Sequence, residues 1–248
     1  MNKFIPKTEL LYKKSHPIDQ LDTSDAIKLM IADQSTAGEA VKKVSQTINS
    51  AIDLIYKRLV SNNYGRLIYT GAGTSGRIGL QDGVELFPTF NWPKKRVEYI
   101  LAGGLKALLN SIENAEDDVT AAKYTVKKKM VNSNDVVIGL AASGNTPFTC
   151  KVLDEAKNRN ALTISISNNP NGEILKYGTV KIVLDTKEET IAGSTRLKAG
   201  TAQKICLNTI SSMVMIKMGR VKNGFMSNLV PTNEKLRKRK LAIESKLK

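Results

Sequence analysis

Residues 66–77 read Arg66-Leu67-Ile68-Tyr69-Thr70-Gly71-Ala72-Gly73-Thr74-Ser75-Gly76-Arg77, and this stretch decides the fold. Its apolar and β-branched start favours a short strand, which the glycines and hydroxyl residues then break before a helix. Glycine lets the backbone turn tightly and approach a ligand closely, and the first N–H groups of a helix attract an anion. The stretch therefore predicts a strand, a tight turn and a helix start that cradle an anionic group.

A second stretch repeats this pattern. The apolar run 135–140 leads into Ala141-Ala142-Ser143-Gly144-Asn145-Thr146, and a third hydroxyl cluster, Gly193-Ser194-Thr195, precedes a long helical pattern. Loops of this kind at the ends of parallel strands predict a phosphorylated small molecule as the ligand. A nucleotide is the weaker candidate, because the Walker lysine is missing and the dinucleotide fingerprint is incomplete.

Strand and helix patterns alternate along the middle of the chain. Alternation of this type predicts an α/β fold with a doubly wound, five-stranded parallel sheet flanked by helices. The five strands are predicted at Leu67–Thr70, Val97–Leu101, Val136–Leu140, Leu162–Ser167 and Val180–Leu184.

Helical patterns also lie at both ends of the chain. Residues 1–20 are predicted to be an extended arm, residues 34–59 one long amphipathic helix, and residues 233–248 a charged helix. We therefore expect an N-terminal arm with helices over residues 1–60, a sheet domain over residues 61–220 and a short C-terminal helical segment over residues 221–248.

The composition narrows the class of protein. Hydrophobic residues make up 41% of the 248 residues, which supports a folded core, and the net charge is +15. The basic residues are scattered, and the few aromatic residues do not interleave with them, so we do not expect nucleic-acid binding. With neither a membrane-spanning run nor a secretory signal at the start, the sequence predicts a cytoplasmic protein. Cys150 and Cys206 lie in apolar helical patterns and are predicted to be packing residues.

Two carboxylates are candidates for acid–base chemistry. Glu85 is flanked by apolar residues, which favours the protonated form that a general acid needs. Glu116 lies in the acidic cluster 113–118, where Asp117 and Asp118 are more simply explained as caps of a following helix. His16 is the sole histidine, and no metal-ligand spacing occurs, so we expect neither a histidine base nor a metal.

Longer motifs resemble a known family. They are Gly71–Arg77, Glu85 with Pro88-Thr89-Phe90, Ala102-Gly103-Gly104, Glu113–Asp117, Ala141–Gly144 with Thr146-Pro147, and above all Gly193-Ser-Thr-Arg-Leu-Lys-Ala-Gly-Thr-Ala-Gln-Lys204. Together they resemble the N-acetylmuramic acid 6-phosphate etherases, which belong to the sugar isomerase (SIS) domain superfamily and are related to the glucokinase regulatory protein. The resemblance runs from Thr8-Glu9 to about Arg239.

This resemblance implies a flavodoxin-like SIS fold and a lyase that uses no metal or cofactor in cell-wall amino-sugar metabolism. The reaction removes the D-lactyl ether from the phosphosugar by elimination and then adds water, which gives N-acetylglucosamine 6-phosphate and D-lactate. Glu85 matches the acid that protonates the departing oxygen, and Glu116 matches the base. The implied substrate and phosphate contacts are Gly73, Thr74, Ser75, Ser143, Gly144, Asn145, Thr146, Ser194 and Lys198.

Two points leave alternatives open. The family has an arginine where this chain has Asn145, and it has smaller residues around the acid than Asp82–Pro88 provides. A straight helix would also carry Glu85 about 14 Å beyond Gly76 at about 1.5 Å per residue. Either the helix bends at Gly83, or Glu85 serves a site built by a second subunit, so we expect a homodimer. The rival functions are a sugar-phosphate-binding regulator without catalysis and a phosphosugar isomerase.

Overall fold

Five parallel strands form the central sheet in a computed structural model that describes residues 5–13 and 16–247. The strands follow the order β2-β1-β3-β4-β5. From β1 the chain adds β2 on one side, and it then adds β3, β4 and β5 on the other side, so the order reverses between β1 and β3. Each predicted strand is confirmed to within one residue: β1 is Leu67–Gly71, β2 Val97–Leu101, β3 Val136–Ala141, β4 Leu162–Ser167 and β5 Val180–Val183. In sheets of this order, ligands bind beyond the carboxyl ends of the strands where the order reverses.

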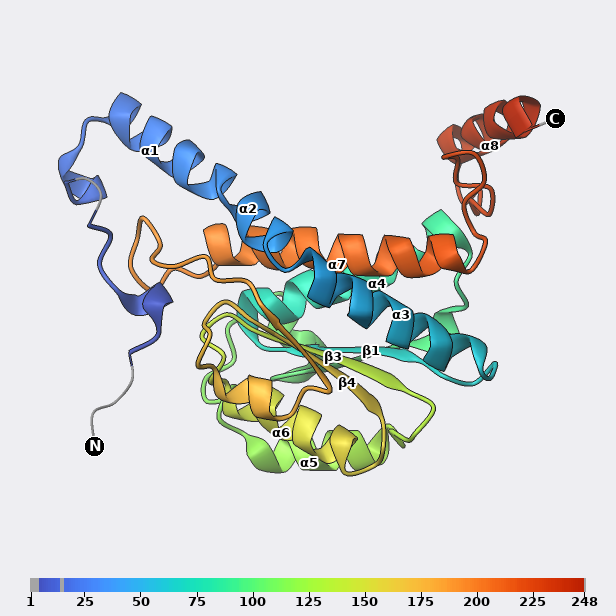
Figure 1. Ribbon diagram of the computed structural model, residues 1–248, viewed down its shortest axis with the longest axis horizontal. Helices are drawn as coiled ribbons and strands as arrows, with labels where there is room; N and C mark the ends of the chain where they lie inside the picture. The colour runs from blue at the N-terminus through green and yellow to red at the C-terminus, as the bar shows by residue number, and fades with distance from the viewer. Residues whose placement is uncertain (1–4, 14–15, 248) are drawn as a thin grey trace.

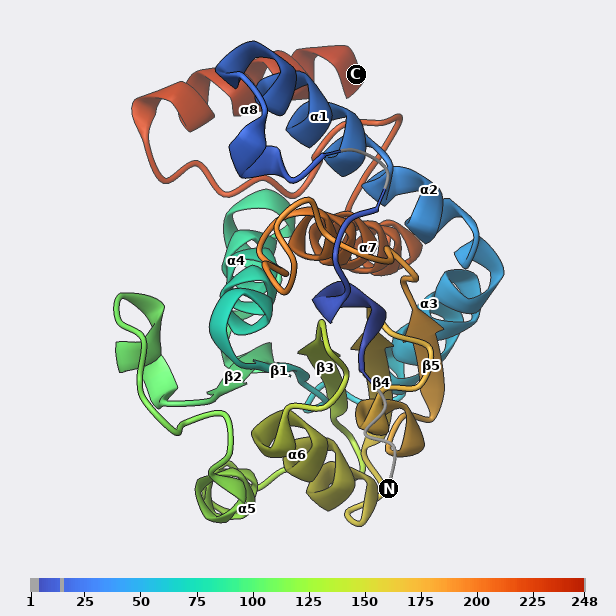
Figure 2. The same cartoon turned by 90° about the vertical axis from the view of Figure 1, so that its left-hand side faces the viewer.

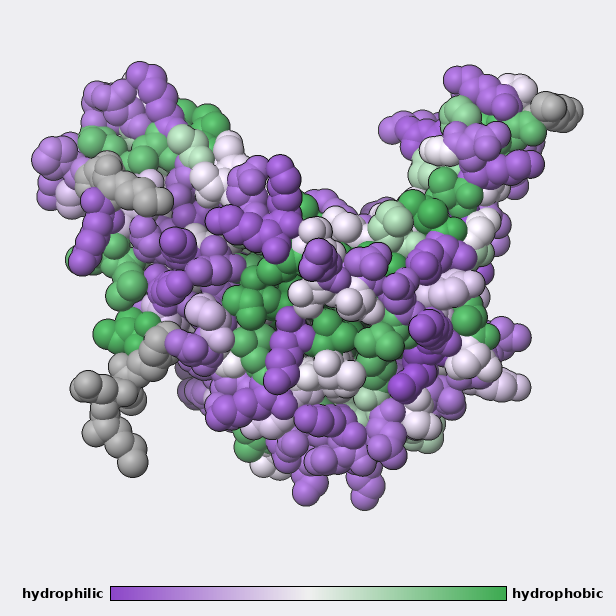
Figure 3. Space-filling view, in the orientation of Figure 1, coloured by the Kyte–Doolittle hydropathy of each residue, from purple (hydrophilic) through white to green (hydrophobic). Residues whose placement is uncertain are grey.

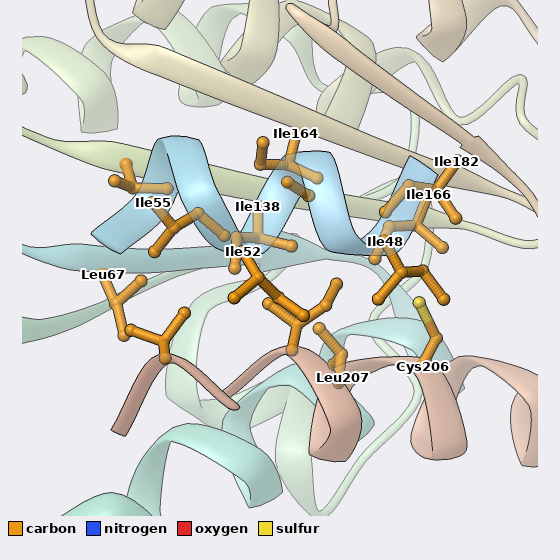
Figure 4. Close-up of a cluster of buried hydrophobic side chains, with 14 of the residues drawn as sticks. Ile48, Ile52, Ile55, Leu67, Ile138, Ile164, Ile166, Ile182, Cys206 and Leu207 are labelled. Carbon is orange, nitrogen blue, oxygen red and sulfur yellow. The ribbon is translucent and has the colours of Figure 1, made fainter. Parts of the chain in front are cut away.

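Helices cover both faces of this sheet (Figures 1 and 2). One face carries α3 (Ser45–Val60), α4 (Gly73–Phe90) and α7 (Lys198–Lys217), and the other carries α5 (Val119–Lys128) and α6 (Pro147–Lys157). Side chains alternate along each strand, so that Leu67 and Tyr69 join the core under α3 and α7 while Ile68 joins the core under α6. Figure 4 shows the first of these cores, where isoleucines of α3 meet isoleucines of the strands. The doubly wound α/β prediction is confirmed.

Short 3-10 helices occupy several connections. They are η1 (Lys7–Glu9), η2 (Ile18–Gln20), η3 (Lys94–Arg96), η4 (Gly104–Leu108) and η5 (Glu173–Lys176). The predicted extended arm therefore contains two helical turns where it is described, and its residues 1–4 and 14–15 lie outside the described residues. After β2, the residues Gly104–Leu108 form the 3-10 helix η4 rather than an α-helix.

The long amphipathic helix predicted over residues 34–59 is wrong in one respect. The chain forms α1 (Thr23–Ser35), α2 (Ala37–Lys42) and α3, with a break at Val44, whose backbone is not helical (φ −111°, ψ 19°). Both α2 and α3 bury their apolar side chains against α7, so the same stripe continues across the break. Periodicity alone cannot show such a change of direction.

Two helices project from the body of the molecule. In Figure 1, α1 and the C-terminal α8 (Glu234–Leu247) extend from opposite ends of α7. Both keep large apolar side chains exposed, namely Ile27 and Ile31 on α1 and Leu241 on α8. Figure 3 shows apolar surface on both projections and on the face between them. Within residues 5–13 and 16–247, no helix has the length and apolar character needed to cross a membrane.

Candidate active site

A cavity of about 430 Å³ opens at the carboxyl ends of β1 and β3, where the strand order reverses. Three loops build its wall: the one between β1 and α4, the one between β3 and α6, and the one before α7. The lining residues are Glu9, Ala72, Gly73, Thr74, Ser75, Arg77, Glu116, Ala142, Ser143, Thr146, Gly193, Ser194, Thr195 and Arg196. The three hydroxyl clusters that the sequence singled out therefore meet around one space.

The first loop is shaped by close contact between a strand end and a helix start. A side chain on Gly71 would stand 2.9 Å from the backbone nitrogen of Gly76, and one on Gly76 would stand 2.9 Å from the carbonyl oxygen of Gly71. Larger residues at either position would push α4 away from β1. Because the turn is this tight, Gly73, Thr74 and Ser75 at the start of α4 all line the cavity, together with the positive end of the helix dipole.

The second loop divides its residues between the cavity and the fold. Ser143 and Thr146 line the cavity. The Asn145 side chain instead accepts a hydrogen bond from the backbone N–H of Glu173 (3.0 Å), which holds the start of η5. Gly144 has a positive φ of 78°, and a side chain there would stand 2.4 Å from the backbone of Gly172. Gly144 and Asn145, which were expected to contact substrate, do not line this cavity, and their contacts shape the loop that carries Ser143 and Thr146.

The third loop brings Ser194 into the cavity but not Lys198. The Lys198 ammonium donates to the carboxylate of Asp33 in α1 (2.7 Å), and both side chains are only 3% exposed. The first backbone N–H groups of α7 are also already paired. The Glu189 carboxylate accepts hydrogen bonds from those of Lys198 (3.0 Å) and Ala199 (2.8 Å). Burial raises the pKa of Glu189 above its ordinary value, and these hydrogen bonds offset only part of that rise. Lys198, expected as a substrate contact, does not line this cavity, and its side chain joins α1 to α7.

Glu116 reaches the cavity from the loop before α5. One of its carboxylate oxygens lies 3.5 Å from the position that a side chain on Gly73 would take. Its backbone carbonyl accepts a hydrogen bond from the N–H of Phe148 (2.8 Å) in α6. Glu116 is exposed, so it is accessible to a ligand that enters the cavity. The structure thus places this predicted carboxylate beside the first hydroxyl loop.

Glu85 lies elsewhere. Helix α4 runs unbroken from Gly73 to Phe90, with Pro88 near its C-terminal end. Glu85 therefore stands about 18 Å beyond Gly73 along the helix axis at about 1.5 Å per residue. Its side chain is exposed and does not line the cavity, so this chain alone does not provide the apolar surroundings that the sequence suggested.

One helical turn before Glu85, the buried carboxylate of Asp82 fixes α4 in place. It accepts hydrogen bonds from the hydroxyl of Tyr69 in β1 (2.8 Å), the amide of Asn208 (2.7 Å) and the hydroxyl of Ser211 (2.9 Å), both in α7. Burial raises the pKa of Tyr69 well above its usual value, so this hydroxyl stays a donor. The Asp82 network ties the middle of α4 to the sheet and to α7.

Three charged residues that the sequence reasoning did not assign also line the cavity. Arg77 donates to the carbonyls of Ala107 (2.8 Å) and Leu108 (3.1 Å), which holds η4 near the site. Arg196 is exposed, and among residues 5–13 and 16–247 nothing pairs with its guanidinium. Glu9 enters from the N-terminal arm. Arg196 and Glu9 both fall within the stretch of family resemblance, which was the signal available for them.

The histidine and the two cysteines lie outside this cavity in the described part of the chain. His16 lines a separate cavity with Tyr12 and Ile191. Cys150 and Cys206 are buried as predicted, and burial raises the pKa of each thiol to about 12. In the described ranges, no group of three His, Cys, Asp or Glu side chains is arranged to hold a metal ion.

Comparison with known proteins gives consistent relatives. The family model described as the glucokinase regulatory protein N-terminal SIS domain matches residues 47–157. An N-acetylmuramic acid 6-phosphate etherase of Mycoplasma mycoides subsp. mycoides is 42% identical over 97% of this chain and 79% of its own length. The etherases of Deinococcus radiodurans (39% identical, covering 94% of this chain and 76% of the relative) and Lactococcus lactis (43%, 92% and 76%) are similar to the same degree.

Solved structures share the fold at much lower identity. A phosphoheptose isomerase from Francisella tularensis matches with a TM-score of 0.61 at 16% identity, over 79% of this chain and 100% of that one. A phosphoheptose isomerase from Neisseria gonorrhoeae matches with a TM-score of 0.55 at 15% identity, over 78% of this chain and 98% of that one. At these identities the likeness establishes the SIS-type fold alone.

Proposed function

This chain belongs to the N-acetylmuramic acid 6-phosphate etherase family, and we propose that its cavity at the ends of β1 and β3 is where the lactyl ether is cleaved. The chain is an etherase, a carbon–oxygen lyase that acts on a phosphorylated amino sugar. The observation that supports this site is the meeting of three hydroxyl loops beside the accessible carboxylate of Glu116. The location that we propose is the cytoplasm, where a sugar phosphate would be retained because its charge prevents it from crossing a membrane unaided.

The phosphate is held by the hydroxyl loops. Thr74 and Ser75 offer hydroxyls and helix-start N–H groups, Gly73 leaves room for the ligand, and Ser143, Thr146 and Ser194 face the same space. Hydroxyl and backbone donors can surround a phosphate without arginine, which fits the presence of Asn145 where the family has an arginine. Arg196 is then available for the second anionic group of the substrate, the lactyl carboxylate.

The chemistry needs a base and an acid. In the open-chain sugar, the C1 aldehyde acidifies the proton on C2, which Glu116 removes. The electron pair forms the C2–C3 double bond and breaks the C3–O bond, and the leaving lactyl oxygen takes a proton from Glu85. Water then adds to C3 and a proton returns to C2, which gives N-acetylglucosamine 6-phosphate and D-lactate. A positioned acid contributes roughly 10²–10⁴-fold to such a step.

Glu85 supplies this proton from a second subunit in our proposal. It is exposed on α4, next to the exposed apolar side chain of Val84, and about 18 Å along the helix from Gly73. The apolar side chains left exposed on α1 and α8 support a homodimer, since exposed apolar faces of this kind mark protein contacts.

Lactate release tests the function directly. Purified protein incubated with N-acetylmuramic acid 6-phosphate is expected to release D-lactate, measured with a lactate dehydrogenase assay, together with equimolar N-acetylglucosamine 6-phosphate. Binding of the phosphosugar without lactate release would favour the non-catalytic regulator. Conversion of an aldose phosphate to a ketose phosphate without lactate would favour the isomerase.

A further inference from the structure

The short N-terminal segment Lys7–Glu9 is pinned at the edge of the cavity. Thr8 is fully buried, and its carbonyl accepts a hydrogen bond from the N–H of Gly193 (2.9 Å). The side chain of Asn169, which follows β4, donates to the Thr8 hydroxyl (3.2 Å) and accepts from the Lys7 N–H (2.7 Å). These contacts hold the backbone of this segment in place, and none of them involves the side chain of Glu9.

The side chain of Glu9 extends from this anchor into the cavity wall. One carboxylate oxygen lies 2.7 Å from the position that a side chain on Gly193 would take, and Gly193 has a positive φ of 75°. Any other residue at position 193 would therefore be strained and would displace the carboxylate. Glycine at this position leaves Glu9 room to reach the third hydroxyl loop.

The Glu9 carboxylate is not needed to hold the arm. Among residues 5–13 and 16–247, no side chain or backbone group pairs with it. The Lys7 ammonium, by contrast, is paired with Asp185 (2.9 Å). A carboxylate only accepts hydrogen bonds and repels anions, so its place beside an anion-binding loop suits neutral donor groups of a ligand.

We propose that Glu9 is a specificity-determining residue of this site, whose carboxylate accepts hydrogen bonds from hydroxyl groups of the sugar. The phosphate lies against the hydroxyl loops, and Glu9 distinguishes a hydroxylated sugar phosphate from a bare anion such as inorganic phosphate. The inference rests on the proposed function for the identity of the sugar. It adds a residue from the N-terminal arm to a site otherwise built by the sheet domain.

The test separates sugar binding from phosphate binding. Calorimetric titrations of wild type, Glu9→Gln and Glu9→Ala use N-acetylglucosamine 6-phosphate and, separately, inorganic phosphate. Hydrogen bonds to a charged group contribute about 1.5–3 kcal/mol, so Glu9→Ala is expected to weaken sugar-phosphate binding about 10- to 100-fold. Its affinity for inorganic phosphate should stay the same or rise, because a nearby negative charge is gone. Glu9→Gln should lie between wild type and Glu9→Ala.

Two results would overturn the inference. One is sugar-phosphate affinity that stays at the wild-type level in Glu9→Ala, or that falls only in step with phosphate affinity. The other is the same selective loss in Lys7→Ala, which removes the ion pair to Asp185 but leaves the carboxylate, since the arm and not the carboxylate would then be responsible. The assay needs no lactate release, so an inactive wild type would defeat the proposed function without deciding this point.

Discussion

Glu116 lines the cavity, whereas Glu85 stands about 18 Å along α4 from Gly73, and this separation predicts how mixed dimers behave. Glu85→Gln and Glu116→Gln each remove one proton-transfer group without changing side-chain size. Each homodimer is therefore expected to lose roughly 10²–10⁴-fold in kcat and to keep its phosphosugar affinity within a few fold. Glu113→Gln, three residues from Glu116 but lining a different cavity, is the matched control and should stay active.

The two inactive variants should restore each other when they share a dimer. In a two-fold symmetric dimer whose sites combine Glu116 of one subunit with Glu85 of the other, a heterodimer of the two variants has one intact site and one doubly altered site. Heterodimers isolated with two different affinity tags are thus expected to show about half of wild-type activity. A random mixture, in which about half of the dimers are heterodimers, should show about a quarter.

A second heterodimer inverts this expectation. Pairing the wild-type chain with the double variant Glu85→Gln/Glu116→Gln leaves each shared site with one altered glutamate, so this heterodimer should be nearly inactive. If each chain used its own two glutamates, the first heterodimer would be inactive and the second half active. Lactate release that followed this second pattern, or full activity in a protein that sedimentation shows to be a monomer, would refute the reasoning.

Two further predictions concern the loops. Lys198→Met should lower the free energy of unfolding by about 3–5 kcal/mol, because it leaves Asp33 buried without its partner. Thermal unfolding measures this loss, and Lys42→Met, at an exposed position, is the control. An unchanged melting temperature together with lost phosphosugar affinity would show that Lys198 is a ligand. Ser143→Leu should weaken N-acetylglucosamine 6-phosphate binding at least about 10-fold by removing a hydroxyl and filling the cavity, and titration calorimetry that found unchanged affinity would count against the hydroxyl loops as the phosphate site.

Local chemistry explains why the sheet could be predicted so closely. The run 136–140 is apolar on both faces of its strand, and the run 162–167 alternates leucine and isoleucine with buried threonine and serine, so both patterns predict a strand without any neighbour. The glycines between β1 and α4 carry the same kind of local information, because the close approach of Gly71 and Gly76 admits no side chain. The ends of the outer helices are harder to predict, since the apolar side chains of α2 and α3 form one continuous stripe across the turn that separates these two helices.

Contacts between distant residues explain what could not be predicted. Lys198 lies in the motif that best identifies the family, yet its partner Asp33 lies in α1, far away in the sequence. Asn145 looks like a loop donor, but it accepts from the N–H of Glu173 in another connection. Glu9 reaches the cavity only because Thr8 is anchored beside β4. No periodicity or spacing encodes these pairings, although the resemblance marked the segments that contain them.

The choice between a bent helix and a second subunit depends on how firmly α4 is held. Gly83 was the expected hinge, but a side chain there would stand 2.7 Å from the hydroxyl of Tyr99 and 2.9 Å from the ring of Tyr69, so glycine serves close packing against the sheet. Gly83 itself already lies about 15 Å along α4 from Gly73 at about 1.5 Å per residue, so a bend there could not return Glu85, two residues later, to the cavity. Since α4 cannot swing Glu85 toward its own cavity at small cost, a neighbouring chain is the simpler source of the acid.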